Sequence, residues 1–123
     1  MLAIPIVILV SVTVAIGLYM GLRYLRRARN PPTLVGVHFL LGAASLEPML
    51  IVLRGGLGHA AARLSPVGIA AAGLIGLALM SGVTAVMVGR TSRQTANLTL
   101  ATHAAVAAGA YLLLLIWAFK VWG

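Results

Sequence analysis

His38, Glu47 and His103 are titratable side chains that lie within otherwise apolar stretches of this sequence. Ionisable groups in such surroundings are costly, and they are therefore candidates for chemistry. An imidazole binds metal ions and exchanges protons near neutral pH. The absence of cysteine excludes disulfides, thiolate metal sites and covalent attachment of a c-type haem. No phosphate-binding glycine loop, Ser-His-Asp set or carboxylate pair is present, so no catalytic residue is assigned and enzymatic activity stays an open question.

The composition indicates that lipid, and not water, surrounds most of the chain. Apolar residues make up 62% of the sequence and charged residues 8%, whereas a water-soluble domain is roughly a quarter charged. The net charge of +8 comes from basic residues placed beside or between apolar runs, as expected for the flanks of membrane spans. Basic and aromatic residues do not interleave, so no nucleic-acid partner is expected.

Four apolar segments are long enough to cross a bilayer as helices, which takes roughly 20 residues each. They cover about residues 2–22, 33–53, 67–89 and 98–119. No period of two runs through them, so the sequence predicts a single all-α domain, a four-helix transmembrane bundle, and not a barrel. Pro31-Pro32 and Ser65-Pro66 predict the starts of the second and third helices. Thr95 or Asn97 is expected to cap the fourth.

The basic residues predict an orientation. The first and third connections carry more of them (Arg23, Arg26, Arg27, Arg29, Arg90, Arg93) than the opposite side (Arg54, Arg63, Lys120). Because the basic excess faces the cytoplasm, both termini are expected outside. Arginine far outnumbers lysine and alanine is abundant, which favours a bacterial protein and hence a multi-pass location in the inner (cytoplasmic) membrane.

Small residues recur at four-residue spacing, which lets helices approach closely in lipid. The pairs are Gly17 with Gly21, Gly68 with Ala72, Ala72 with Gly76, Ala78 with Gly82, and Ala85 with Gly89. We expect them to pack the bundle tightly. A homo-oligomer contact through one of these faces stays open.

The two histidines are expected at the same depth. His38 and His103 each lie five residues after the start of a span, about 8 Å into the membrane, and the second and fourth spans run in the same direction. Two level histidines on different helices can bind one planar metal macrocycle from its two faces, and bundle cores hold such cofactors.

The neighbours of the histidines suit a cofactor pocket. Gly42, on the His38 face, leaves room for a macrocycle, as do Ala107 and Ala110 on the His103 face. Thr99 is expected to accept from the second ring nitrogen of a histidine and so fix which nitrogen faces the metal. The arginines on the same side of the membrane are expected to pair with haem propionates.

In these residues the chain resembles small b-type membrane cytochromes with two histidine ligands, in which an HxxxG step precedes the pocket. The matching residues are His38, Gly42 and His103, on two helices. The resemblance implies haem b bound by His38 and His103, with electron transfer to or from quinone or a partner subunit of a respiratory complex. Di-haem relatives use four histidines, whereas His59 lies in a connection here, so a single haem is implied.

A purely structural interpretation stands beside this one. The histidines can instead hydrogen-bond to each other, or to Ser45 and Thr99, and so fix helix pairing. Such bonds contribute about 0.6 kcal/mol on average in membranes.

Glu47 gives the remaining hypotheses. It lies nine residues after His38, about 900° around the helix, and therefore points to the opposite side. Pro48 can kink the helix beside it, and Arg54 returns to the same face. Glu47 can contact quinone, take up a proton in a small proton-coupled transporter or channel unit, or contact another chain. In the last case the protein is a cofactor-free accessory subunit of a larger membrane complex.

Overall fold

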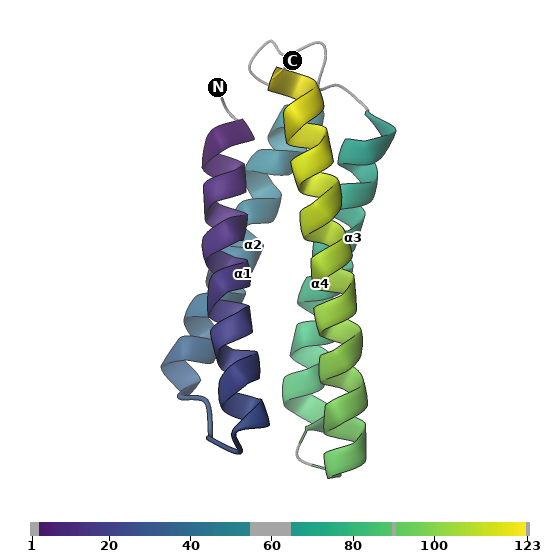
Figure 1. The fold of residues 1–123 in the computed structure, drawn as a ribbon. Helices are drawn as coiled ribbons and strands as arrows, with labels where there is room; N and C mark the ends of the chain where they lie inside the picture. The colour runs from purple at the N-terminus through teal and green to yellow at the C-terminus, as the bar shows by residue number, and fades with distance from the viewer. Residues whose placement is uncertain (1–2, 55–64, 90, 123) are drawn as a thin grey trace.

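The computed structural model describes residues 3–54, 65–89 and 91–122. Within them the chain forms four α-helices: α1 (Ala3–Leu25), α2 (Pro32–Leu53), α3 (Pro66–Val88) and α4 (Arg93–Trp122) (Figure 1). Each is long and apolar enough to cross a membrane. The predicted all-α architecture with four candidate spans is confirmed, and its helix lengths and composition are those of a multi-pass membrane protein.

The helix starts follow from local sequence. Pro31 is extended (φ −61°, ψ 140°) and α2 begins at the next residue without a side-chain cap. The Ser65 hydroxyl accepts from the backbone N–H of Gly68 at 3.4 Å, at the start of α3. α4 begins earlier than expected, because Ser92 and not Thr95 or Asn97 caps it. The Ser92 hydroxyl accepts from the backbone N–H of Thr95 at 3.1 Å. Because the cap lies at Ser92, the first turn of α4 contains polar residues.

α1 ends in a Schellman motif. The backbone N–H of Ala28 donates to the carbonyl of Arg23, and that of Arg27 to the carbonyl of Tyr24, both at 2.9 Å. Arg27 has a φ of 60°, in the left-handed region that this motif requires and that glycine adopts most easily. The chain thereby turns sharply toward α2.

The helices form two hairpins. The first hairpin is α1 with α2, and the second is α3 with α4; the helices of each hairpin pack against each other more extensively than α2 packs against α3 or α1 against α4. Figure 1 shows the two termini at one end of the bundle and the last turns of α1 and α3 at the other. We call the surface along which the first hairpin faces the second the inter-hairpin seam.

The buried core occupies only the end of the bundle that carries the termini. We call this cluster the terminal core; it draws on all four helices and contains Ile6, Val10, Met49, Val52, Leu53, Ala71, Ala72, Ile75, Ala110, Leu114, Trp117 and Ala118. Toward the other end, beyond the level of His38 and His103, the buried residues in the described ranges are Ala85 and Ala96. Both belong to the second hairpin, so no buried residue fills the seam there.

Polar contacts join α1 to α4 on both sides of this level. Ser11 Oγ lies 2.8 Å from Tyr111 Oη, and Tyr24 Oη donates to Asn97 Oδ1 at 2.6 Å. Each bond crosses from the first hairpin to the second, so the two hairpins are held in register at two depths.

Candidate functional site

The side chains of His38 and His103 lie together at the inter-hairpin seam. Their ring centroids are 6.1 Å apart and their planes are 80° apart. His38 comes from α2 and His103 from α4, so each hairpin supplies one imidazole. The predicted proximity of the two rings is confirmed, because the parallel course of α2 and α4 brings residues of equal depth side by side.

The first hairpin fixes the His38 ring from α1. Nδ1 of His38 lies 3.0 Å from the backbone carbonyl of Thr13. A carbonyl oxygen only accepts, so Nδ1 carries the hydrogen and donates it. One turn further along α1, a Cβ on Gly17 would lie 2.9 Å from Cε1 of His38. The ring therefore rests on the glycine backbone.

The second hairpin holds His103 in the same way. Nδ1 of His103 lies 2.9 Å from the backbone carbonyl of Ala78 on α3, and Ser81 Oγ lies 3.3 Å from the same nitrogen. A Cβ on Gly82 would lie 3.1 Å from Cε1 of His103. Here too the imidazole packs on a glycine and donates from Nδ1.

The two hairpins thus repeat one arrangement. In each, the carbonyl that accepts from the histidine lies 25 residues before it, and the glycine follows that carbonyl by one helical turn. With the hydrogen on Nδ1, the Nε2 atom of each neutral imidazole has a free lone pair. Sequence reasoning singled out Gly17 and Gly82 only as packing residues. Their equal spacing from His38 and His103 was the signal that could have identified them as part of the site.

Thr99 and Gly42 make contacts other than the expected ones. The Thr99 hydroxyl donates to carbonyls of its own helix, Thr95 at 2.9 Å and Ala96 at 3.1 Å. The backbone carbonyl of Ala78 accepts from His103 in its place. Gly42 is buried, and a Cβ there would lie 3.1 Å from Leu79 Cδ2. Its small size therefore lets α2 pack against α3.

If the histidines only fix helix pairing, they do so through partners other than the expected Ser45 and Thr99. Ser45 is buried and donates to the carbonyl of Gly42 at 2.7 Å, so it serves its own helix. The histidines bond the facing helix of their own hairpin, and no hydrogen bond links them to Ser45 or Thr99. What joins the two rings across the seam is their edge contact alone.

Glu47 lies on the outer surface of α2, away from the histidine pair. Its side chain is exposed, whereas Ser45 and Met49 on the inner face are buried. This agrees with the predicted half-turn offset from His38. Arg54 is also exposed, and no ion pair between described residues involves Glu47. Glu47 therefore belongs to a lipid- or partner-facing surface.

The arginines expected to accompany the pair do not contact it. Arg23 donates to the carbonyl of Arg29 within the α1–α2 connection, and Arg26, Arg27 and Arg93 are exposed. Arg63, Arg90 and the third histidine, His59, lie outside the described residues.

The separation of the two ring centroids, 6.1 Å, is that of two imidazoles that share one metal ion. Two rings that share one ion through Nε2, at about 2.0 Å each, have centroids about 6 Å apart. Among the described residues no group of three or more His, Cys, Asp or Glu side chains gathers in one place. A tetrahedral protein-only site therefore lacks ligands, whereas an ion whose other ligands come from a macrocycle needs just these two.

Comparison of the chain with protein-family models, curated proteins and solved structures finds no match. The histidine pair and its surroundings are therefore the basis for a functional assignment.

Proposed function

We propose that the protein is an integral membrane b-type haem protein that transfers electrons, with His38 and His103 as the axial ligands of one haem iron. The observation that carries the proposal is the 6.1 Å separation of the two rings across the inter-hairpin seam. It matches the spacing of two imidazoles on one ion.

The hydrogen bonds of the pair support ligation. A ligand histidine usually donates its other ring N–H to a carbonyl or carboxylate, which fixes the ring and makes the coordinating nitrogen more basic. The carbonyls of Thr13 and Ala78 have this role for His38 and His103. In both rings Nε2 is therefore the nitrogen left to coordinate a metal ion.

The packing of the seam supports a flat apolar ligand. The terminal core closes the bundle on one side of the histidines, and on the other side no described residue is buried between the hairpins. A macrocycle that entered the seam on that side would separate surfaces between which no described residue is buried. The polar bond between Tyr24 and Asn97 would limit how far they separate.

The residues of the chain have separate tasks in this proposal. A bis-histidine haem supplies one-electron exchange, with a potential set by its ligands and surroundings. Thr13 and Ala78 orient the imidazoles, Gly17 and Gly82 allow each ring to reach the seam, and the terminal core excludes water from one side. With one ligand pair per chain, the electron would pass to quinone or to a partner subunit.

The proposed topology has both termini outside, in the inner membrane of a bacterium. Five basic residues belong to the last turn of α1, the connection to α2 or the first residue of α4: Arg23, Arg26, Arg27, Arg29 and Arg93. Figure 1 shows these parts of the chain at the end of the bundle opposite the termini. The excess of basic residues at that end supports a cytoplasmic placement.

The test is an absorption spectrum of the purified protein, expressed with haem supplied. We expect a Soret band in the wild type, and its loss in His38→Ala and in His103→Ala. His59→Ala is the matched control, since it removes the third histidine of the chain and should keep the band. A wild-type protein without a Soret band contradicts the proposal.

Glu47 favours a second candidate, an accessory subunit of a larger membrane complex. A carboxyl group on the outer face of a membrane helix is costly in lipid, and a partner that covers it removes this cost. Glu47→Leu is then expected to weaken co-purification of a partner while the helical content of the chain is retained. The transporter alternative predicts loss of flux in Glu47→Gln, and the outward position of Glu47 gives it no support.

A further inference from the structure

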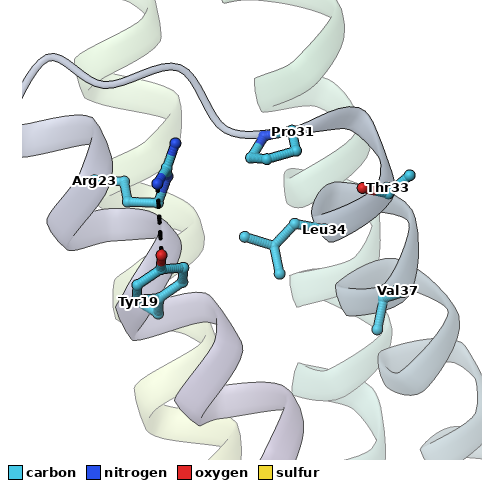
Figure 2. Close-up of a pocket in the computed structure, with 6 residues that line it drawn as sticks. All are labelled: Tyr19, Arg23, Pro31, Thr33, Leu34 and Val37. Carbon is cyan, nitrogen blue, oxygen red and sulfur yellow. Dashed lines mark hydrogen bonds between the residues drawn. The ribbon is translucent and has the colours of Figure 1, made fainter.

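A cavity of about 380 Å³ lies between α1 and α2, near the end of the bundle opposite the termini. We call it the α1–α2 pocket; it is lined by Tyr19, Arg23, Pro31, Thr33, Leu34 and Val37. Figure 2 shows the Arg23 guanidinium and the Tyr19 hydroxyl facing each other on α1, with Leu34 directed toward them from α2. The pocket therefore has a cationic rim and an apolar wall.

Arg23 is held in place, yet it keeps unused donors. Its Nη2 donates to the carbonyl of Arg29 at 2.7 Å, and its guanidinium carbon lies 5.8 Å from the centroid of the Tyr19 ring. The Nη1 contact to Tyr19 Oη is long, at 3.5 Å. The Nε–H is buried and has no acceptor. A guanidinium has five N–H donors, so this one is fixed in orientation but incompletely satisfied.

The start of α2 faces the same pocket with a second unused donor. Its N-cap residue, Pro31, makes no side-chain cap bond. Leu34 and Val35 donate to the carbonyl of Pro31, whereas the N–H of Thr33 has no partner among the described residues. An uncapped helix N-terminus carries a partial positive charge and attracts anions. Arg23 and Thr33 both line the pocket, so two sources of positive charge lie beside one cavity.

No carboxylate of the chain can neutralise this charge. Glu47 is the single acidic residue of the sequence, and it lies 14 residues beyond Thr33, about 20 Å along α2. The side chains of the protein therefore supply no counter-anion at the pocket.

We propose that the α1–α2 pocket binds the phosphate of an anionic phospholipid. The pocket lies at the ends of two membrane-spanning helices, the depth at which lipid phosphates reside. Arg23 and Thr33 contact the phosphate oxygens, since a guanidinium and phosphate form strong charge-assisted bonds. Leu34 and Val37, further into the membrane, contact the first part of the acyl chains. Tyr19, Thr33 and Val37 are exposed on the outside of the bundle, so lipid reaches the pocket without entering the seam.

Native mass spectrometry of the full chain in detergent, titrated with phosphatidylglycerol, tests this proposal. We expect Arg23→Gln to lower the affinity about tenfold, the value of one charge-assisted bond. Arg26→Gln is the matched control: it removes the same charge from an exposed side chain outside the pocket, and should change the affinity less than about twofold. Arg23→Lys keeps the charge but not the fork of donors, and should lie between the two.

Three results would overturn the proposal. Equal losses in Arg23→Gln and Arg26→Gln would indicate a diffuse attraction to the basic connection. Phosphatidylcholine bound as tightly as phosphatidylglycerol would show that the lipid's net charge is not recognised. Displacement of the lipid by millimolar inorganic phosphate would assign the pocket to free phosphate. Helical circular dichroism of each variant verifies folding, and Arg23→Lys keeps the test decisive if Arg23→Gln fails to fold.

Discussion

The rings of His38 and His103 lie 6.1 Å apart across the inter-hairpin seam, and each is bound to a carbonyl of its own hairpin. Because no hydrogen bond holds the two rings to each other, their separation depends on how the hairpins dock. Two hydrogen bonds between α1 and α4 link the same two hairpins: Ser11 with Tyr111, and Tyr24 with Asn97.

Substitutions of the glycines beneath the rings should disturb the site directly. In Gly17→Ala the new Cβ would meet Cε1 of His38 at 2.9 Å, and in Gly82→Ala it would meet Cε1 of His103 at 3.1 Å. We expect Gly17→Ala to cost about 1–3 kcal/mol through overpacking, measured as the free energy of unfolding in mixed micelles. Gly82→Ala should cost less, because the His103 ring has to give by only a few tenths of an ångström. If the protein binds haem as proposed, Gly17→Ala should also lower the haem content. Gly21→Ala and Gly76→Ala are the controls, since a Cβ there meets nothing within 4 Å. Equal effects in all four variants would contradict the assigned packing.

The bond between Ser11 and Tyr111 can be measured by a double-mutant cycle. Ser11→Ala and Tyr111→Phe each remove one partner of the 2.8 Å contact. We expect a coupling of about 0.6 kcal/mol and no more than about 1.7 kcal/mol, the range for such bonds in membranes. If the contact sets hairpin docking and the protein binds haem as proposed, each single variant should also shift the absorption maximum of the haem. Strict additivity of the two substitutions would show that the hydroxyls do not interact.

In the terminal core, Trp117→Phe should destabilise the protein less than Trp117→Ala. The side chain is 1% exposed, and its Nε1–H is buried without an acceptor. Trp117→Phe removes an unsatisfied donor worth about 1–3 kcal/mol, which offsets the smaller ring, so the net change should stay within about 1 kcal/mol. Trp117→Ala should cost about 3–5 kcal/mol. Thermal unfolding of both variants measures the two changes in stability. A Phe variant as unstable as the Ala variant would indicate that Nε1 has a hydrogen-bond partner.

Arg27 should be replaceable by glycine with a gain in stability. Its φ of 60° costs a residue with a Cβ about 1 kcal/mol relative to glycine. Arg27→Gly should therefore raise the free energy of unfolding by up to that amount. Arg26→Gly, which removes the same charge at a position without a positive φ, should lower it or leave it unchanged. The measurement is the free energy of unfolding of both variants. A lower value in Arg27→Gly than in the wild type would contradict the Schellman geometry.

Much of the fold follows from local patterns in the sequence. Apolar segments of sufficient length, interrupted at Pro31-Pro32 and Ser65-Pro66, determine four helices because the backbone must satisfy its own hydrogen bonds in lipid. The equal depth of His38 and His103 follows from the fixed rise per residue on two helices that run in the same direction. The outward position of Glu47 follows from the helical period.

The tertiary structure decides what each histidine touches. Thr13 and Ala78 contact the rings through backbone carbonyls, a group that every residue has, so no side chain in the sequence distinguishes them. Rotation of each helix about its axis is set by packing against its neighbours, which directs Leu79 to the space beside Gly42 and leaves Thr99 bonded to its own helix. Residue types thus determine which elements form and at what depth, whereas the docking of helices in three dimensions decides which atoms complete the site.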